Sequence, residues 1–196
     1  DMLDNLAEKN AVYQVDEDWY FDITIDEKFG SLSHYGSKSM LELCQARGGD
    51  PQRPGKHNPL DCIVWQKERS GEPSWESSRG RGRPGWHIEC GAIATKYLGT
   101  DFDIQGGGSD LVFPHHEMSA SQARIANGEE FAKTYVHTAM VAYQGEKMSK
   151  SLGNLVFVSK LRASGVEPAV IRLALLNRHY RTDWGFSTAD LDLAKR

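Results

Sequence analysis

The spacing of apolar and polar positions predicts short, mixed elements in the first part of the chain. Apolar residues at helical spacing indicate a helix over 2–6 that runs into a strand at 11–13, and the alternation over 19–25 predicts a half-buried strand. A further helix over 39–44 ends near two glycines. Loops rich in Pro, Gly, Ser and Arg follow, so residues 1–78 are expected to form a small, irregular α+β region rather than a regular sheet.

From Gly85 onward the pattern changes to longer alternating elements. A strand, a loop, a helix and a second strand in this order predict a parallel α/β sheet, in which ligands bind beyond the carboxyl ends of the strands. Glycine-rich loops fall at two such ends, at 106–108 and 145–153. The expected elements are a helix over 86–98 stopped by Gly99, a strand over 102–104, a helix over 115–127 and a strand over 135–141.

The last part of the chain predicts one more strand and two helices. The apolar run 155–158 suggests a strand. Residues 168–176 form a helical pattern that is apolar on most faces, which predicts that this helix is largely buried. Ser187 is a candidate N-cap for a final helix.

Composition places the chain among ordinary soluble proteins. Of 196 residues, 39% are hydrophobic and 26% charged, and no apolar run approaches the roughly 18 residues that span a bilayer. The N-terminus has no signal-peptide pattern, so we expect a cytoplasmic protein without membrane contact. Cys44, Cys62 and Cys90 are odd in number and widely spaced, which favours free thiols. A net charge of −4 gives no general attraction to nucleic acid, although basic clusters occur at 79–83 and 147–150.

The stretch GEKMSKSLGN, residues 145–154, carries two lysines and two serines between glycines. Such runs are usually solvated turns. Alternatively, Lys147 and Lys150 are held on a flexible arm to meet phosphate charge that develops only during a reaction. Composition alone leaves both interpretations open.

The stretch GGGSD, residues 106–110, also allows two interpretations. Three glycines let the backbone approach a ligand closely, and a hydroxyl and a carboxylate follow that can hold sugar hydroxyls. The alternative is a tight structural turn, because the stretch is not GxGxxG and lacks the Lys-Ser/Thr pair of a P-loop.

A third candidate is the run His115, His116 and Glu117 at a predicted helix start. It forms either a hydrogen-bonded cluster or part of a zinc site with Cys90, since thiolate and imidazole are preferred zinc donors. Cys90 and His115 supply only two ligands, so any remaining ligands lie elsewhere or in a substrate. Trp86 is either a packing residue or the wall of a small pocket.

Three motifs in this order resemble a known family. GRPGWHIEC at 82–90, DIQGGGSDLVFPHHE at 103–117 and EKMSKSLGN at 146–154 are similar to the catalytic domain of class I aminoacyl-tRNA synthetases, in the cysteine-activating branch. The resemblance covers nearly the whole chain. It implies the second half of a Rossmann-like nucleotide-binding fold with a parallel sheet: a connective insert (1–78), the catalytic half with the lysine-rich loop (79–158) and the start of a helical stem-contact-type domain (159–196).

The resemblance also implies a role for each motif. Lys147 and Lys150 would stabilise the charge on the leaving pyrophosphate, Asp110 would hold the ATP ribose, and Trp86 would lie against the substrate. Cys90 and His115 would be zinc ligands, and ATP would act with Mg²⁺. The implied ATP-binding residues are Gly106, Gly107, Gly108, Ser109, Asp110, Val141, Lys147, Met148, Ser149, Lys150 and Ser151.

Two members of this branch differ at positions that the chain displays. Cysteinyl-tRNA synthetases usually have His where this chain has Gln105, and a zinc-binding Glu where it has Ser119. Ligases of the mycothiol pathway, which join cysteine to the amine of glucosaminyl-inositol, read DIQGGGSD and HHE followed by an apolar residue and Ser or Thr. The resemblance therefore favours an ATP-dependent ligase with ATP, L-cysteine and glucosaminyl-inositol as partners. The alternatives are a cysteinyl-tRNA synthetase, which would bind tRNA, and a non-catalytic synthetase-like binding module.

The family's His-x-Gly-His motif and its N-terminal zinc cysteine have no match within residues 1–196. The chain starts with Asp1 and stops at Arg196 inside a helical pattern, so we expect a fragment that is catalytically silent by itself. With two ligands present, we expect weak retention of zinc.

Overall fold

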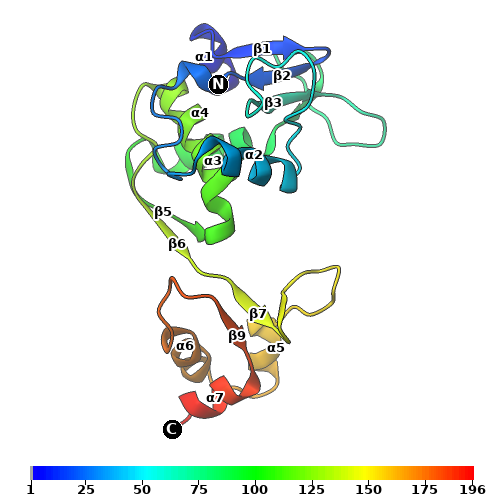
Figure 1. Cartoon of the computed structure of the whole chain (residues 1–196). Helices are drawn as coiled ribbons and strands as arrows, with labels where there is room; N and C mark the ends of the chain where they lie inside the picture. Colours follow the sequence, from blue (N-terminus) through cyan, green and yellow to red (C-terminus); the bar gives the residue numbers. More distant parts are fainter. Residues whose placement is uncertain (1) are drawn as a thin grey trace. The chain divides into compact units, whose positions relative to one another are not determined.

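The structure is a computed structural model that describes residues 2–196 (Figure 1). Contacts divide the chain into two compact units. The first runs up to Gly106 and includes Leu111–Val136, and the second comprises Gly107–Asp110 and His137–Arg196. The functional division at residues 78 and 158 is a different kind of boundary and stays a prediction.

The first unit contains a four-stranded antiparallel sheet in the order β1-β2-β3-β4. The expectation of an irregular region without a regular sheet was wrong, because the central pairing joins segments far apart in sequence, with Tyr20 opposite Ile63. The strand predicted over 19–25 ends at Phe21, since the Asp22 carboxylate accepts a hydrogen bond from the Thr24 amide and starts a 3₁₀ turn. The strands are β1 Val12–Val15, β2 Asp18–Phe21, β3 Cys62–Lys67 and β4 Gly82–Pro84.

Four helices build the core of this unit together with the sheet: α1 Met2–Glu8, α2 Ser37–Ala46, α3 Trp86–Leu98 and α4 Glu117–Asn127. A short turn over Val112–His116 leads into α4. The helix predicted from Trp86 is confirmed, and Gly99 ends it with a φ of 80° that favours glycine. The most deeply buried apolar side chains come from helix, strand and turn alike: Leu6, Phe21, Val64, Phe113 and Met118.

Strands β5 Phe102–Gly108 and β6 Ala132–Thr138 form a two-stranded sheet (Figure 1). At its start the Asp101 amide donates to the Glu130 carbonyl, and at its end the Thr138 hydroxyl donates to the Gly107 carbonyl, so the strands run parallel. The predicted β-loop-α-β order is confirmed. The boundaries of the elements differ from those predicted. Gly106–Gly108 belong to strand β5 rather than to a loop, and the strand predicted over 135–141 is divided between β6 and β7.

The second unit has a three-stranded sheet in the order β8-β7-β9, with β7 parallel to β9. The Ser187 N-cap is confirmed as a capping box with Asp190. A small core joins Ile171 and Ala174 to Leu191. The elements are β7 Val141–Tyr143, β8 Glu146–Lys147, β9 Trp184–Phe186, α5 Val158–Ala163, α6 Pro168–Leu176 and α7 Thr188–Ala194.

Two predictions about this unit were wrong. The run 155–158 forms no strand, and α5 begins at Val158, since a short apolar run does not distinguish strand from helix start. Helix α6 is not largely buried: Leu173, Leu175 and Leu176 are 50%, 50% and 67% exposed. None of the helices between Met2 and Arg196 is both long and apolar enough to cross a membrane.

Candidate active site

The candidate site in the first unit begins where β4 passes into α3 at Gly85. The Gly85 amide donates to the Val64 carbonyl, which holds this turn against β3. A Cβ atom at Gly85 would lie 1.9 Å from the carbonyl oxygen of Ile63, far inside van der Waals contact. Only glycine allows this approach, and it places Trp86 and His87 at the first turn of α3.

Trp86, His87 and His115 form an aromatic cluster at this helix start. The Trp86 and His115 rings lie 5.2 Å apart between centroids, and the Nδ1 atoms of His87 and His115 are 3.0 Å apart. One of these nitrogens donates and the other accepts, according to the tautomer. Burial, and then the neighbouring His115, lower the pKa of His87 to about 3, and burial lowers the pKa of His115. Both imidazoles are therefore neutral near pH 7.

Cys90 lies one helical turn after Trp86, so the two residues share a face of α3. The Cys90 thiol is free, and its partial desolvation, followed by the Glu89 charge, raises its pKa. Among residues 2–196 no three His, Cys, Asp or Glu side chains come together as metal ligands. These residues alone therefore do not make a zinc site, and the assignment of Cys90 and His115 as ligands stays a prediction.

The other two residues of the His-His-Glu run have different surroundings. The Nε2 atom of His116 lies 3.3 Å from the Gln105 amide nitrogen. Glu117 is fully buried, and its carboxylate accepts hydrogen bonds from the Gly30 and Ser33 amides at 2.8 and 2.7 Å. Glu117 thus anchors the loop between the sheet and α2, which is the hydrogen-bonded alternative left open from the sequence.

Gln105 and Ser119, at which cysteinyl-tRNA synthetases and mycothiol-pathway ligases differ, each contact a histidine of this site. Gln105 faces His116, and the Ser119 hydroxyl donates to the His87 carbonyl at 3.1 Å. Ser119 is buried on α4, where it joins the first turn of α3. A serine here binds backbone rather than offering a carboxylate to a metal.

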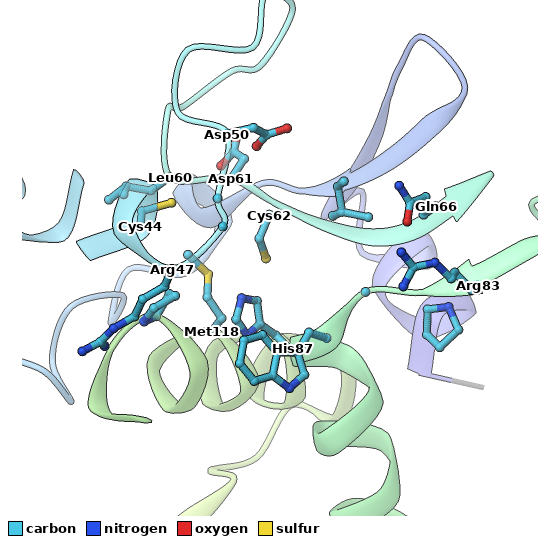
Figure 2. Close-up of a pocket in the computed structure, with 17 residues that line it drawn as sticks. Cys44, Arg47, Asp50, Leu60, Asp61, Cys62, Gln66, Arg83, His87 and Met118 are labelled. Carbon is cyan, nitrogen blue, oxygen red and sulfur yellow. The ribbon is translucent and has the colours of Figure 1, made fainter. Parts of the chain in front are cut away.

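A cavity of about 250 Å³ opens beside Trp86 and His87 (Figure 2). Trp86 forms part of its wall, as one of the two interpretations from the sequence predicted, but sequence reasoning missed the other walls, which come from the end of α2, from β3, from β4 and from the turn before α4. No local pattern signals this convergence of distant segments. The polar and sulfur-containing side chains of the lining include Cys44, Arg47, Asp50, Cys62, Gln66 and Met118.

In the second unit the structure brings two predicted site residues together. The Lys147 ammonium lies 3.6 Å from the Asp110 carboxylate. Val141 and Lys147 share a hollow of about 370 Å³ with Met140 and Trp184. Sequence reasoning did not include Trp184, which becomes a neighbour of Val141 through the parallel pairing of β7 with β9.

The lysine-rich loop is closed by its own hydrogen bonds. The Ser149 amide donates to the Asn154 side-chain oxygen at 2.8 Å, and the Asn154 amide group donates to the Lys147 carbonyl at 3.2 Å. The hydroxyls of Ser149 and Ser151 are 3.1 Å apart. Lys150 lies at the exposed tip of this loop. The catalytic and ATP-binding roles of the loop residues, and those of 106–110, stay predictions.

Comparison with known proteins identifies the class to which this fold and these motifs belong. The whole chain, residues 1–196, matches the family described as tRNA synthetases class I (C) catalytic domain, and the chain belongs to this family. The fold class and the resemblance inferred from the sequence are thereby confirmed. A solved structure, the ternary complex of Agrobacterium radiobacter K84 LeuRS with tRNA and LeuAMS, is similar with a TM-score of 0.48 and 17% identity over 66% of this chain and 22% of that chain.

Eight relatives that are 54–60% identical to this chain carry one common name, L-cysteine:1D-myo-inositol 2-amino-2-deoxy-alpha-D-glucopyranoside ligase. The protein of that name from Kribbella flavida is 60% identical over 95% of this chain and 46% of its own length. That from Thermomonospora curvata is 57% identical over 99% of this chain and 47% of its own length. The chain thus spans about half the length of the curated relatives that it matches.

Proposed function

We propose that the protein containing this chain is a cytoplasmic, ATP-dependent ligase that joins L-cysteine to the amine of glucosaminyl-inositol in mycothiol biosynthesis. The observation that carries this proposal is the 60% identity, over 95% of the chain, to a ligase named for these two substrates. The alternative of a cysteinyl-tRNA synthetase is not favoured, because Gln105 and Ser119 stand where that enzyme usually has His and Glu.

The reaction needs two steps, since a free carboxylate is a poor electrophile. The cysteine carboxylate attacks the α-phosphorus of ATP, which forms cysteinyl-adenylate and releases pyrophosphate. The acceptor amine then attacks the activated carbonyl carbon, loses a proton and displaces AMP. The residues of this chain act chiefly by positioning and by charge, which are the large contributions to such transfers.

In the first step the mobile cations have the main role. Lys147 and Lys150 neutralise the negative charge that grows on the departing pyrophosphate, and an exposed loop suits this role because it closes only around bound nucleotide. Asp110 holds a ribose hydroxyl from the same unit. Mg²⁺ bound to ATP would shield the phosphates when present. Trp86, 60% exposed at the start of α3, offers a flat apolar surface to the cysteinyl group.

The test uses the full-length enzyme that contains this chain, supplied with ATP, L-cysteine and either glucosaminyl-inositol or tRNA. AMP release and the product mass are followed, with L-serine in place of cysteine as the control. We expect the cysteinyl amide of the amino sugar and no cysteinyl-tRNA. Cysteinyl-tRNA without the amide would overturn the proposal in favour of the synthetase, and absence of ATP binding would favour a non-catalytic module.

A further inference from the structure

We propose that the cavity beside Trp86 and His87 is the acceptor site, which binds the amino sugar during the second step. This inference rests on the proposed function and deepens it, because it assigns one substrate to side chains, chiefly Gln66 and Arg83, to which the family resemblance gives no role. The cavity lies wholly within the first unit (Figure 2).

The position of the cavity is the first argument. Trp86 and His87 line it, and the same two residues contact His115 in the cluster predicted to hold the cysteinyl group. An amine that attacks the cysteinyl carbonyl must approach to about 3 Å in the reactive complex. The acceptor therefore needs a space that adjoins this cluster, and the cavity shares a wall with it.

The polar lining is the second argument. Gln66 of β3 and Arg83 of β4 are directly opposite one another in the sheet, so their side chains share one face and lie together at one side of the cavity (Figure 2). Gln66 is only 7% exposed. Its amide offers both donors and acceptors, and Arg83, held through Nε by Glu72, keeps its terminal amino groups for a ligand. Such groups suit a ligand rich in hydroxyls.

Paired charges add to the polar lining of the cavity. Asp50 also lines the cavity, fixed by the Tyr20 hydroxyl and the Lys56 ammonium. Because Lys56 balances its charge, Asp50 serves the acceptor as a hydrogen-bond acceptor for hydroxyl groups. Arg47, whose guanidinium donates to the Phe113 carbonyl, completes the polar rim.

The apolar floor is the third argument. Leu60, Cys62 and Met118 line the cavity with carbon and sulfur, which suits the C–H faces of a sugar ring. Burial raises the pKa of the Cys62 thiol. The Cys62 sulfur accepts a hydrogen bond from the Gln122 side-chain amide. The neutral thiol does not compete with the amine for the activated carbonyl, since the thiolate is the nucleophilic form.

The size of the cavity indicates which part of the acceptor it holds. Its volume of about 250 Å³ lies just below the roughly 300 Å³ at which pockets for small organic ligands begin. One ring of a two-ring acceptor fits inside, while the other stays at the mouth. The amine-bearing ring lies at the Trp86 side, where the carbonyl is expected, and its neighbours Gln66 and Arg83 bind hydroxyl groups.

The experiment compares two cavity variants of the full-length enzyme with a matched control. Gln66→Met removes the amide at similar volume, and Arg83→Gln removes the charge of a side chain that is 42% exposed. Gln14→Met is the matched control, because it makes the same Gln-to-Met change at an exposed position of β1 outside the cavity. Each enzyme is assayed for cysteine-dependent ATP–pyrophosphate exchange and for the KM of glucosaminyl-inositol.

Each cavity variant should raise the KM for glucosaminyl-inositol about tenfold, the usual effect of losing one hydrogen bond in a buried site. The KM values for ATP and cysteine in exchange should change far less, and Gln14→Met should match the wild type. An unchanged KM for the amino sugar in both variants, or an equal rise in the KM for cysteine, overturns the acceptor site while leaving the proposed function intact. A wild-type enzyme that exchanges but forms no amide with the amino sugar overturns the proposed function itself.

Discussion

The Lys147 ammonium lies 3.6 Å from the Asp110 carboxylate. Both side chains are substantially exposed, so the ion pair itself contributes no more than about 1 kcal/mol to stability. Its significance is positional, because the glycine-rich stretch and the lysine-rich loop, which are distant in sequence, meet within one unit. Groups predicted to contact the ribose and the phosphates of one ATP molecule are already neighbours.

We expect Lys147→Ala and Lys150→Ala to slow adenylate formation in the full-length enzyme. Removing one donor that acts on transition-state charge costs about 10²- to 10³-fold in kcat. The KM for ATP should change little, since the interaction strengthens only as the pyrophosphate departs. Cysteine-dependent ATP–pyrophosphate exchange measures both constants. Lys38→Ala on α2, where the side chain is 92% exposed, is the control and should keep full activity; equal loss in all three variants would contradict the assignment.

Asp110→Asn tests whether this carboxylate holds the ribose. We expect the variant to raise the KM for ATP about tenfold, because a hydrogen bond to a charged group is lost. The decisive comparison uses 2′-deoxy- and 3′-deoxy-ATP. One of these analogues should bind the wild type more weakly than ATP does, whereas the Asp110→Asn variant should bind that analogue and ATP equally well. Asp103→Asn, at an 87% exposed side chain on β5, serves as control. Additive losses with both analogues would show that Asp110 does not touch the ribose.

Gly85→Ala should destabilise the first unit, whereas Gly36→Ala should not. Both glycines are helix N-caps in the same extended conformation, with φ of −70° in each. A Cβ atom at Gly85 would collide with the Ile63 backbone, but nothing lies within 4 Å of one at Gly36. Overpacking of this kind costs about 1–3 kcal/mol or more. Urea unfolding of the two variants measures the difference in their free energies of unfolding. Equal midpoints would show that β3 shifts to accommodate the added methyl group.

Asp26 should make stability sensitive to acid. Burial raises the pKa of this carboxyl, but hydrogen bonds from Arg124 at 2.7 and 3.2 Å outweigh that effect and hold the pKa below its usual range. A carboxyl with a depressed folded-state pKa stabilises the fold fully above its unfolded value of about 4, and this contribution is lost as pH falls below it. The free energy of unfolding, measured from pH 6 downward, should therefore fall less steeply in Asp26→Asn than in the wild type. The exposed Asp192→Asn should follow the wild-type curve, and three parallel curves would refute the role of Asp26.

Elements defined by neighbours in the chain could be predicted from the sequence. The helix from Trp86 to its glycine stop, and the Ser187 capping box, depend on hydrogen bonds between residues three or four positions apart. The apolar run at 155–158 was ambiguous for the same reason, because no distant partner was available to decide between strand and helix. Only the packing of α7 against α6 decided which leucines of α6 remain exposed.

The features of the candidate site can also be separated into those that the sequence predicts and those that only the tertiary structure shows. The sequence by itself determined the family, the Trp86–His115 motifs and the lysine-rich loop, because these side chains stand in contiguous motifs whose chemistry can be interpreted locally. Tertiary structure alone decided that Gln66 faces Arg83, that Glu117 is an anchor rather than a ligand, and that Asp110 meets Lys147. These relationships join residues that are far apart in the chain, and only the burial of a shared core and the pairing of distant strands bring them together.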